Sequence, residues 1–457
     1  MQREGVAVRT PFPLKNGKRI LFANVPADGH FNPLTDLAIY LQSIGYEVRW
    51  YSSSMYTGKL KKLGIHHYAF KKALDVTQEN LNEFFPERLQ IKNKIARLNF
   101  DFKNFFILRS TEYLEDIQRI HATYPFDLFI ADCMFLGLPL VKHMLNVPVL
   151  SMGIIPLSEN SRDLPPPGLG MLPSYSIAGK MKQALLRGLA TRVLFRKSDR
   201  LMKRILRNHS IDPGKGFLFD VLNNNTDFLL QSGTPGFEYY RSDISRNVRF
   251  VGPLLPHEPN KKRDSWFDER LISFEKVILV TQGTVEKDIE KLLVPTLQAF
   301  QNSNYLVVAT TGGSQTAALR ARFPQRNIII EDFIPFADVM PYANVYITNG
   351  GYGGVLLGIQ HQLPLVVAGV HEGKNEINAR IGYFELGKNL ATETPTPMQL
   401  RKAVEVVLTD PMYKQNVVKL GEEFDRYETN KLCAGYIAEL LSGTRSKRAV
   451  QKMEMEN

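Results

Sequence analysis

Residues 345–380 read VYITNGGYGGVLLGIQHQLPLVVAGVHEGKNEINAR, and this stretch decides the fold. The β-branched and aromatic run at 345–348 predicts a buried strand, and the apolar pattern at 355–361 predicts a helix. A second buried strand is predicted at 364–368, followed by a polar helix that begins near Lys374. Strand, turn, helix and strand in this order form a βαβ unit, the building block of a parallel sheet with helices on both faces.

The turn inside this unit, NGGYGG at 349–354, has glycine at four of its six positions. It places backbone N–H groups and the positive end of a helix at the carboxyl edge of the sheet, where phosphates bind. Glycine also allows another group to approach the backbone closely. The pattern favours phosphate binding over the alternative, a tight turn without a ligand.

The composition is that of a soluble globular protein of 457 residues, with 44% hydrophobic and 23% charged residues, long enough for two or three domains. We find no apolar run of the roughly 18 residues that a membrane span needs, and no secretory signal, so we expect a cytoplasmic protein without stable membrane insertion. Two cysteines are too few for a disulfide framework or a metal cluster. The net charge of +11 suits phosphate-bearing ligands, but its even spread argues against nucleic acid as a partner.

Strand and helix patterns alternate twice along the chain, which predicts an α/β protein with two doubly wound, Rossmann-like domains facing a cleft. We expect the following parts: a flexible tail at 1–17, an N-terminal domain at 18–251, a proline-rich linker at 252–275, a C-terminal domain at 276–415, helices at 416–443 that could cross back to the N-terminal domain, and a charged tail at 444–457. Strands are expected at 19–25, 46–51, 66–70, 128–131, 148–152, 249–251, 277–281, 306–309, 328–331, 345–348 and 365–368.

Two helical stretches of the N-terminal domain have unusual composition. Residues 73–123 are rich in phenylalanine, which fits core packing but also an apolar pocket for a hydrophobic acceptor. The candidate acceptor-binding residues are Phe84, Phe85, Phe105 and Phe106. Residues 180–208 are basic, which favours a solvated helix face over contact with an anionic membrane surface.

His30 and Asp132 are the candidate catalytic residues. His30 follows the first strand and Asp132 ends the strand at 128–131, so both belong at the carboxyl edge of one sheet. A histidine there can act as a general base, and a carboxylate bonded to its ring fixes the tautomer and stabilises the imidazolium. Asp127 is the competing partner, although it precedes its strand and belongs at the opposite edge.

Three loops of the C-terminal domain are expected at one sheet edge: TQGT at 281–284, FIPF at 333–336 and the glycine turn. Thr281 and Thr284 could offer hydroxyls to a diphosphate beside the backbone donors. Phe333 could lie flat against a nucleobase.

With these motifs, the sequence resembles glycosyltransferases of the two-Rossmann-domain (GT-B) architecture, in the large family that glycosylates small lipophilic molecules from nucleotide sugars. That family includes plant secondary-product and bacterial macrolide glycosyltransferases. The resemblance extends from the loop at Gly29 and His30 to the C-terminal helices. It implies that His30 deprotonates the acceptor hydroxyl with Asp132 as its partner, and that the segment from Phe333 stacks on the base.

Loops and resemblance together predict a donor site formed by Thr281, Gly283, Thr284, Phe333, Ile334, Asn349, Gly350, Gly351, Gly353, Gly354, His371, Glu372, Lys374 and Asn375. Several positions depart from the family pattern. Asn349 replaces the usual diphosphate-binding histidine, and Leu357 falls where an acidic residue usually holds the ribose. The usual Asp-Gln pair that holds the sugar hydroxyls falls near Lys374 and Asn375. The donor base, uridine or deoxythymidine, therefore stays open.

The sequence leads us to expect an inverting, metal-independent glycosyltransferase that moves a hexose, with UDP-glucose as the expected donor, to a hydroxyl of a small apolar natural product. No cofactor and no metal site are expected. Two alternatives remain: a nucleotide-sugar 2-epimerase of the same fold, and a nucleotide-sugar-binding or lipid-binding protein without catalysis.

Overall fold

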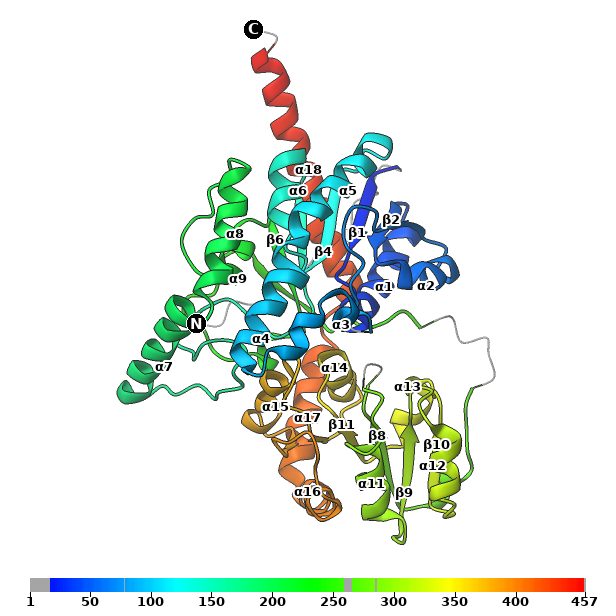
Figure 1. Ribbon diagram of the computed structural model, residues 1–457. Coiled ribbons are helices and arrows are strands. Elements are labelled where there is room, and N and C mark those ends of the chain that lie inside the picture. Colours follow the sequence, from blue (N-terminus) through cyan, green and yellow to red (C-terminus); the bar gives the residue numbers. More distant parts are fainter. Residues whose placement is uncertain (1–16, 78, 259–264, 284–285, 456–457) are drawn as a thin grey trace.

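The computed structural model describes residues 17–77, 79–258, 265–283 and 286–455, with the side chains of Lys94 and of residues from 444 onward left out. The chain forms two α/β domains, each built on a parallel sheet, with the N-terminal domain above the C-terminal domain in Figure 1. The predicted fold class is therefore confirmed. Residues 1–16 of the tail expected at 1–17, residue Thr284 and part of the linker lie outside the described residues.

The N-terminal sheet has seven parallel strands in the order β3-β2-β1-β4-β5-β6-β7. The order reverses between β1 and β4, and such switch points are where ligands bind in doubly wound sheets. The strands are β1 (Arg19–Ala23), β2 (Glu47–Ser52), β3 (His66–Ala69), β4 (Leu128–Asp132), β5 (Val149–Gly153), β6 (Phe228–Ser232) and β7 (Val248–Gly252).

Helices cover both faces of this sheet, and two of them continue into a π-helical turn, η3 (Phe102–Ile107) or η4 (Ala190–Leu194). The α-helices are α1 (Asp28–Ser43), α2 (Thr57–Lys62), α3 (Leu81–Phe84), α4 (Lys94–Asp101), α5 (Arg109–Thr123), α6 (Leu138–Leu145), α7 (Ile177–Leu189), α8 (Arg196–Asn208) and α9 (Leu218–Asn224). Short 3-10 turns are η1 (Ser54–Tyr56), η2 (Pro86–Gln90) and η5 (Pro235–Phe237).

The C-terminal sheet has six parallel strands in the order β10-β9-β8-β11-β12-β13, with its switch point between β8 and β11. The strands are β8 (Lys276–Thr281), β9 (Tyr305–Thr310), β10 (Ile328–Glu331), β11 (Val345–Thr348), β12 (Leu365–Val367) and β13 (Gly387–Asn389). The helices are α10 (Arg270–Ser273), α11 (Leu293–Phe300), α12 (Thr316–Arg322), α13 (Phe336–Val339), η6 (Met340–Tyr342), α14 (Tyr352–Gln360), α15 (Lys374–Tyr383), α16 (Pro397–Thr409), α17 (Pro411–Phe424) and α18 (Thr429–Met455).

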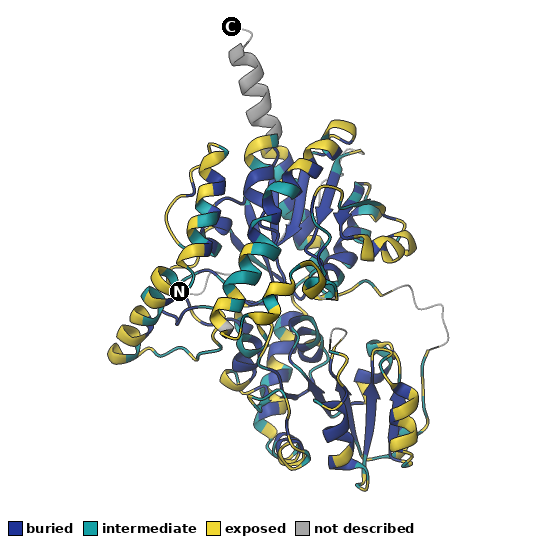
Figure 2. Cartoon of the chain, in the orientation of Figure 1, coloured by how far each residue is buried: buried dark blue, intermediate teal, exposed yellow. Residues whose placement is uncertain are grey.

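Each sheet is buried on both faces, as Figure 2 shows for the strands of both domains. In β1, Leu21 and Ala23 belong to the apolar cluster on one face, whereas Ile20 and Phe22 belong to the cluster on the other. This alternation follows from the pleat of a strand, and burial of both faces explains why the strands read as continuous apolar runs.

Helix α18 joins the end of the chain to the N-terminal domain. It contacts α1 and β7, and its residues Cys433, Ala434 and Ile437 are buried in the same cluster as Phe22. The helix continues to Met455, beyond residue 443, where we expected a charged tail to begin. Lysine, arginine and glutamate are good helix formers, so charge alone does not end a helix.

Two strands, β6 and β13, fall where the sequence analysis placed none. Strand β6 is a five-residue buried run, too short for periodicity to separate it from a helix. Strand β13, with the sequence Gly387-Lys388-Asn389, has little β-propensity and forms because it pairs with the edge of β12.

Candidate functional site

His30 and Asp132 contact one another at the switch point of the N-terminal sheet. His30 Nδ1 lies 2.8 Å from Asp132 Oδ1, with the Asp132 side chain fully buried and the His30 side chain 18% exposed. His30 lies in the first turn of α1, directly after β1, and Asp132 is the last residue of the neighbouring strand β4. The structure thus brings the two predicted residues together.

Backbone donors hold the Asp132 carboxylate in place. Val25 N–H donates to Asp132 Oδ2 and Met134 N–H donates to Asp132 Oδ1, each at 2.8 Å. Because an ionised carboxylate only accepts hydrogen bonds, His30 must carry its proton on Nδ1, and its Nε2 then carries the lone pair of a base. Asp127, the competing candidate, bonds to Lys18 and to the Arg19 backbone N–H, at the opposite edge of the sheet.

The glycine turn forms the corresponding feature of the C-terminal domain, at the switch point between β8 and β11. Gly350 has φ +87°, and a Cβ there would lie 1.8 Å from Asn378 Oδ1, so position 350 requires glycine. Gly351 is the N-cap of α14, and no side chain caps this helix. The first N–H groups of α14 therefore point out of the turn without a partner inside the helix, beside open space at Gly353.

The side chains of Asn349 and Thr281 bond to backbone groups of the same edge. Asn349 Nδ2 donates to the Gln282 carbonyl, and Asn349 Oδ1 accepts from Gly351 N–H at 3.3 Å. Thr281 Oγ1 accepts from Gly283 N–H at 3.3 Å, and the residue is buried. Gly283 has φ +79° and faces Asn349. These side chains shape the loops and accept from their N–H groups, so the donors toward a ligand are the first N–H groups of α14, which the helix itself leaves unpaired.

Phe333 is 70% exposed at this edge, with its ring against Gly313, whereas Ile334 is buried in the C-terminal core. An exposed aromatic ring beside two loop glycines offers a flat surface on which a base can stack. The loop after β9 contributes Gly312 and Gly313, both with positive φ. The sequence analysis did not single out this glycine pair. Its position directly after a predicted strand was the signal that could have identified it.

The loop after β12 holds the remaining predicted donor residues, His371, Glu372, Lys374 and Asn375. His371 is exposed, with its N–H bonded to Glu393, and Lys374 Nζ donates to Glu372 Oε2 at 2.6 Å. Asn375 Nδ2 donates to the Gly168 carbonyl at 2.9 Å and so contacts the N-terminal domain. The four residues share one loop and helix start, and the side chains of Glu372, Lys374 and Asn375 have partners within the protein.

Further contacts join the domains near these loops. Tyr352 Oη donates to the Ser232 carbonyl at 2.8 Å. Glu376 Oε1 accepts from Gly168 N–H and Gly170 N–H, both at 2.8 Å. These contacts hold the start of α14 and of α15 against the loops of the N-terminal domain, and the sequence analysis did not predict them.

Buried charged side chains add a further contact between the domains. Arg380 Nη2 lies 2.5 Å from Glu238 Oε1 and Arg380 Nη1 lies 3.0 Å from Glu376 Oε2, with all three side chains largely buried. Burial alone would raise the pKa of Glu238, but the positive charges of Arg380 and Arg241 lower it below its ordinary value. The Glu238 carboxylate thus stays ionised because the buried guanidinium groups of Arg380 and Arg241 stabilise its negative charge.

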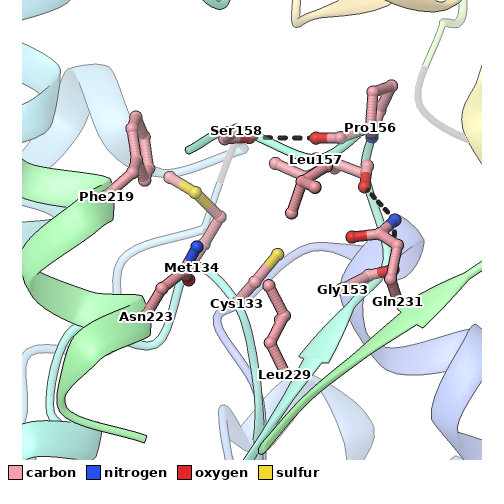
Figure 3. Close-up of a pocket in the computed structure, with 11 residues that line it drawn as sticks. Cys133, Met134, Gly153, Pro156, Leu157, Ser158, Phe219, Asn223, Leu229 and Gln231 are labelled. Carbon is pink, nitrogen blue, oxygen red and sulfur yellow. Dashed lines mark hydrogen bonds between the residues drawn. The ribbon is translucent and has the colours of Figure 1, made fainter. Parts of the chain in front are cut away.

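A narrow space with a cavity volume of about 20 Å³ lies beside Asp132, at the carboxyl ends of β4, β5 and β6. Figure 3 shows side chains of mostly apolar character around it, with Gln231 at one side. The lining residues are Cys133, Met134, Gly153, Ile155, Pro156, Leu157, Ser158, Phe219, Asn223, Leu229 and Gln231. Burial and the Asp132 charge raise the pKa of Cys133 to about 12, so this wall presents a neutral thiol.

The predicted acceptor phenylalanines do not line this space. Phe84 is exposed in α3, and Phe85 makes an edge contact with Phe100. Phe105 and Phe106 contact each other in η3, and Phe106 packs against the core cluster behind the sheet. Their contact with an acceptor stays a prediction.

Over the described ranges, no group of three or more His, Cys, Asp or Glu side chains is arranged to hold a metal ion. None of the helices in those ranges is long and apolar enough to cross a bilayer.

Comparison with known proteins identifies the family that this chain resembles. The family model described as "UDP-glucoronosyl and UDP-glucosyl transferase" matches residues 226–425. A 4'-demethylrebeccamycin synthase from Lentzea aerocolonigenes is 32% identical over 409 residues, which cover 89% of this chain and 96% of that protein. A UDP-glucosyltransferase 1 from Beauveria bassiana is 29% identical and covers 90% of this chain and 93% of its own.

Among solved structures, CalG4, a calicheamicin glycosyltransferase, matches with a TM-score of 0.72 at 19% identity, over 94% of this chain and 99% of that one. The likeness covers both sheets and the helices around them, so the two chains share a fold.

Proposed function

Because this chain belongs to the family of UDP-glucuronosyl and UDP-glucosyl transferases, we propose that it moves a hexose from a UDP-sugar to a hydroxyl of a small apolar natural product, with inversion at the anomeric carbon. Family membership makes it a glycosyltransferase with a nucleotide-sugar donor. The sugar, with glucose expected, the acceptor and the stereochemistry are the proposal.

The 2.8 Å contact between His30 Nδ1 and Asp132 Oδ1 carries this proposal. His30 Nε2 takes the proton of the acceptor hydroxyl as that oxygen bonds to the anomeric carbon of the sugar. The bond from that carbon to the diphosphate breaks on the opposite face, which inverts the configuration. Asp132 stabilises the imidazolium that forms, as a carboxylate partner does for other catalytic histidines.

The departing diphosphate is placed at the glycine turn. Backbone N–H groups at the start of α14, together with the positive end of that helix, neutralise the charge that develops on the leaving oxygen. Such fixed donors supply this stabilisation without a metal, so we propose metal-independent transfer. Phe333 stacks on the base, since its ring is exposed beside Gly313.

We propose that the acceptor enters at the narrow space beside Asp132. Its lining is mostly apolar with a few polar groups, the usual character of a pocket for a small lipophilic molecule. A polycyclic acceptor requires this space to widen toward the cleft. The relatives' names support a natural-product acceptor, because one of them is named a 4'-demethylrebeccamycin synthase.

Recognition of the donor base rests on fewer contacts than in the family pattern. Leu357, at the position of the usual ribose-binding carboxylate, packs against the C-terminal core. The carboxylate of the nearby Glu376 already bonds to Gly168, Gly170 and Arg380. Loss of one charge-assisted hydrogen bond to the ribose costs about 1.5 to 3 kcal/mol, or roughly one to two decades in affinity. We therefore propose UDP-glucose as a working donor, with a modest preference over deoxythymidine diphosphate glucose.

The test is a screen of UDP- and deoxythymidine diphosphate sugars against apolar hydroxylated acceptors, read by mass, with and without EDTA. We expect a mass gain of one hexose, unaffected by EDTA, and a β-linked product from an α-linked donor. Full dependence on Mg²⁺ or an α-linked product would contradict the proposed chemistry. Epimerised nucleotide sugar without transfer would instead indicate the epimerase.

A further inference from the structure

The helix α7 and the loop before it expose an unusual number of large apolar side chains. Among the described residues, eight of the 22 exposed large hydrophobic side chains lie within a single stretch of 25 residues, 169–193. They are Leu169, Leu172, Tyr175, Ile177, Met181, Leu185, Leu189 and Val193. Isolated exposed apolar residues are ordinary, but a contiguous group marks an interaction site.

The polarity of α7 is reversed relative to an ordinary surface helix. Its one buried residue is Gln183, whose side chain bonds to the Asp163 carbonyl and to the Ser174 backbone. Arg187 reaches the Leu164 carbonyl on the same side. The face toward the protein thus carries Gln183 and Arg187 beside the partly buried Leu186, while Ile177, Met181 and Leu185 on the outer face are 83%, 69% and 75% exposed. A helix that only covered a core would show the opposite arrangement.

Positive charge surrounds this apolar face. Residues 164–197 contain six Lys or Arg residues and no Asp or Glu. At about 100° per residue, Ile177, Met181 and Leu185 fall within roughly 80° of one another, with Lys180 on one flank and Lys182 on the other. Both lysines are exposed. A flat apolar stripe with flanking cations matches the boundary of an anionic bilayer, where apolar side chains enter and lysines meet the headgroups.

The position of α7 suits this arrangement. The helix projects from the side of the N-terminal domain at the level where the two domains meet (Figure 1), and most of its residues are exposed in Figure 2. Residues Pro156–Ser158, which line the narrow space beside Asp132, precede α7 in the chain, with the loop 159–176 between them. The phenylalanine-rich stretch 73–123 lies alongside η4, since Asn99 Nδ2 donates to the Leu194 carbonyl at 2.8 Å.

We propose that α7 and the turn η4 form a docking surface for an anionic lipid membrane, so that the protein binds such a membrane peripherally. The apolar stripe enters the headgroup boundary, and the surrounding lysines and arginines attract acidic lipids. No helix is required to span the bilayer. This binding is independent of the proposed transfer reaction.

The proposal is tested by flotation of the full chain with vesicles of phosphatidylcholine alone or with 30% phosphatidylglycerol added. We expect at least tenfold stronger binding to the anionic vesicles and a marked loss at 1 M NaCl. Two variants probe the two contributions: Met181→Glu with Leu185→Glu for the apolar stripe, and Lys180→Glu with Lys182→Glu for the charge. Each should lower binding by at least tenfold.

Met398→Glu is the matched control, because Met398 is 78% exposed on α16 of the C-terminal domain, and it should bind as the unaltered protein does. Equal binding by all variants, or absence of binding to anionic vesicles, would overturn the proposal. Self-association of the unaltered chain that Leu185→Glu abolishes, seen by sedimentation, would assign the surface to a second copy instead.

Discussion

Tyr352 Oη, in the first turn of α14, donates a 2.8 Å hydrogen bond to the carbonyl of Ser232, the last residue of β6. One hydrogen bond thus links the predicted phosphate-binding turn to the carboxyl edge of the opposite sheet. We expect Tyr352→Phe to lower stability by about 1 kcal/mol, the usual net value of one hydrogen bond. We also expect a several-fold rise in KM for the donor, because the turn loses its fixed position.

Donor kinetics and thermal unfolding measure both effects. Tyr342→Phe is the control, since Tyr342 is partly exposed and contacts Phe267 away from the cleft. If Tyr352→Phe matches the unaltered protein in both measurements, this contact has no part in placing the turn.

Two glycines of the turn should respond differently to alanine. At Gly350 the φ of +87° and the 1.8 Å approach to Asn378 Oδ1 predict a large loss of stability and of donor binding. At Gly353 nothing lies within 4 Å of the added Cβ, so stability should hold or rise slightly. UDP affinity should still fall for Gly353→Ala, because its methyl group enters the space assigned to the diphosphate.

Titration calorimetry with UDP and thermal unfolding separate these outcomes. Undiminished UDP binding by Gly353→Ala would place the diphosphate elsewhere.

Glu238 makes the domain contact sensitive to acid. Its pKa is lowered by Arg380 and Arg241 against the effect of burial, so its contribution to stability is present above the unfolded pKa, roughly 4.3, and is lost as the pH falls through the lower folded value. Glu238→Gln removes this dependence and leaves Arg380 with Glu376 as its remaining partner. We expect a loss of about 3 kcal/mol at pH 7.

Urea unfolding at pH 7 and at pH 3.5 measures the change. Glu290→Gln, which removes an exposed ion pair with Arg322, should shift stability by less than about 1 kcal/mol. An equally small effect of Glu238→Gln would show that the buried pair contributes little to the contact.

The sequence predicted both halves of the site because each follows a strand end. His30, Asp132 and the glycine turn could be placed at carboxyl edges from the strand pattern alone, since parallel strands bring these ends together. The partners of Asp132 at Val25 and Met134 are backbone groups, which carry no residue signature.

Contacts between the domains could not be read from the sequence. Asn375 was a candidate for sugar contacts, but it and its neighbour Glu376 bond to the loop at Gly168 and Gly170, 206 to 208 residues earlier in the chain. The sequence could not show which phenylalanines of residues 84–106 pack in the core and which are exposed, and only the structure shows this. Composition identifies an apolar surface but not what it faces.

The thiol of Cys133 should be unreactive toward alkylating reagents, although it lies next to the candidate catalytic residue Asp132. Its pKa of about 12, raised by burial and by the Asp132 charge, leaves it as a neutral thiol up to alkaline pH, and burial also raises the pKa of Cys433. We expect no rise in the rate of alkylation by iodoacetamide between pH 7 and 10 in the folded protein. Denatured protein, in which both thiols ionise near pH 8.5, is the control. Rapid alkylation of folded protein at pH 8 would contradict this assignment.

The most direct test of the account is the turnover of His30→Ala with UDP-glucose and an aliphatic alcohol acceptor, with UDP affinity measured in parallel. We predict a fall in kcat of roughly two to four orders of magnitude, the usual contribution of a general base, with UDP affinity nearly unchanged. His66→Ala, an exposed histidine on β3, should leave turnover intact. Near-normal turnover of His30→Ala on this weakly acidic alcohol would contradict His30 as the base.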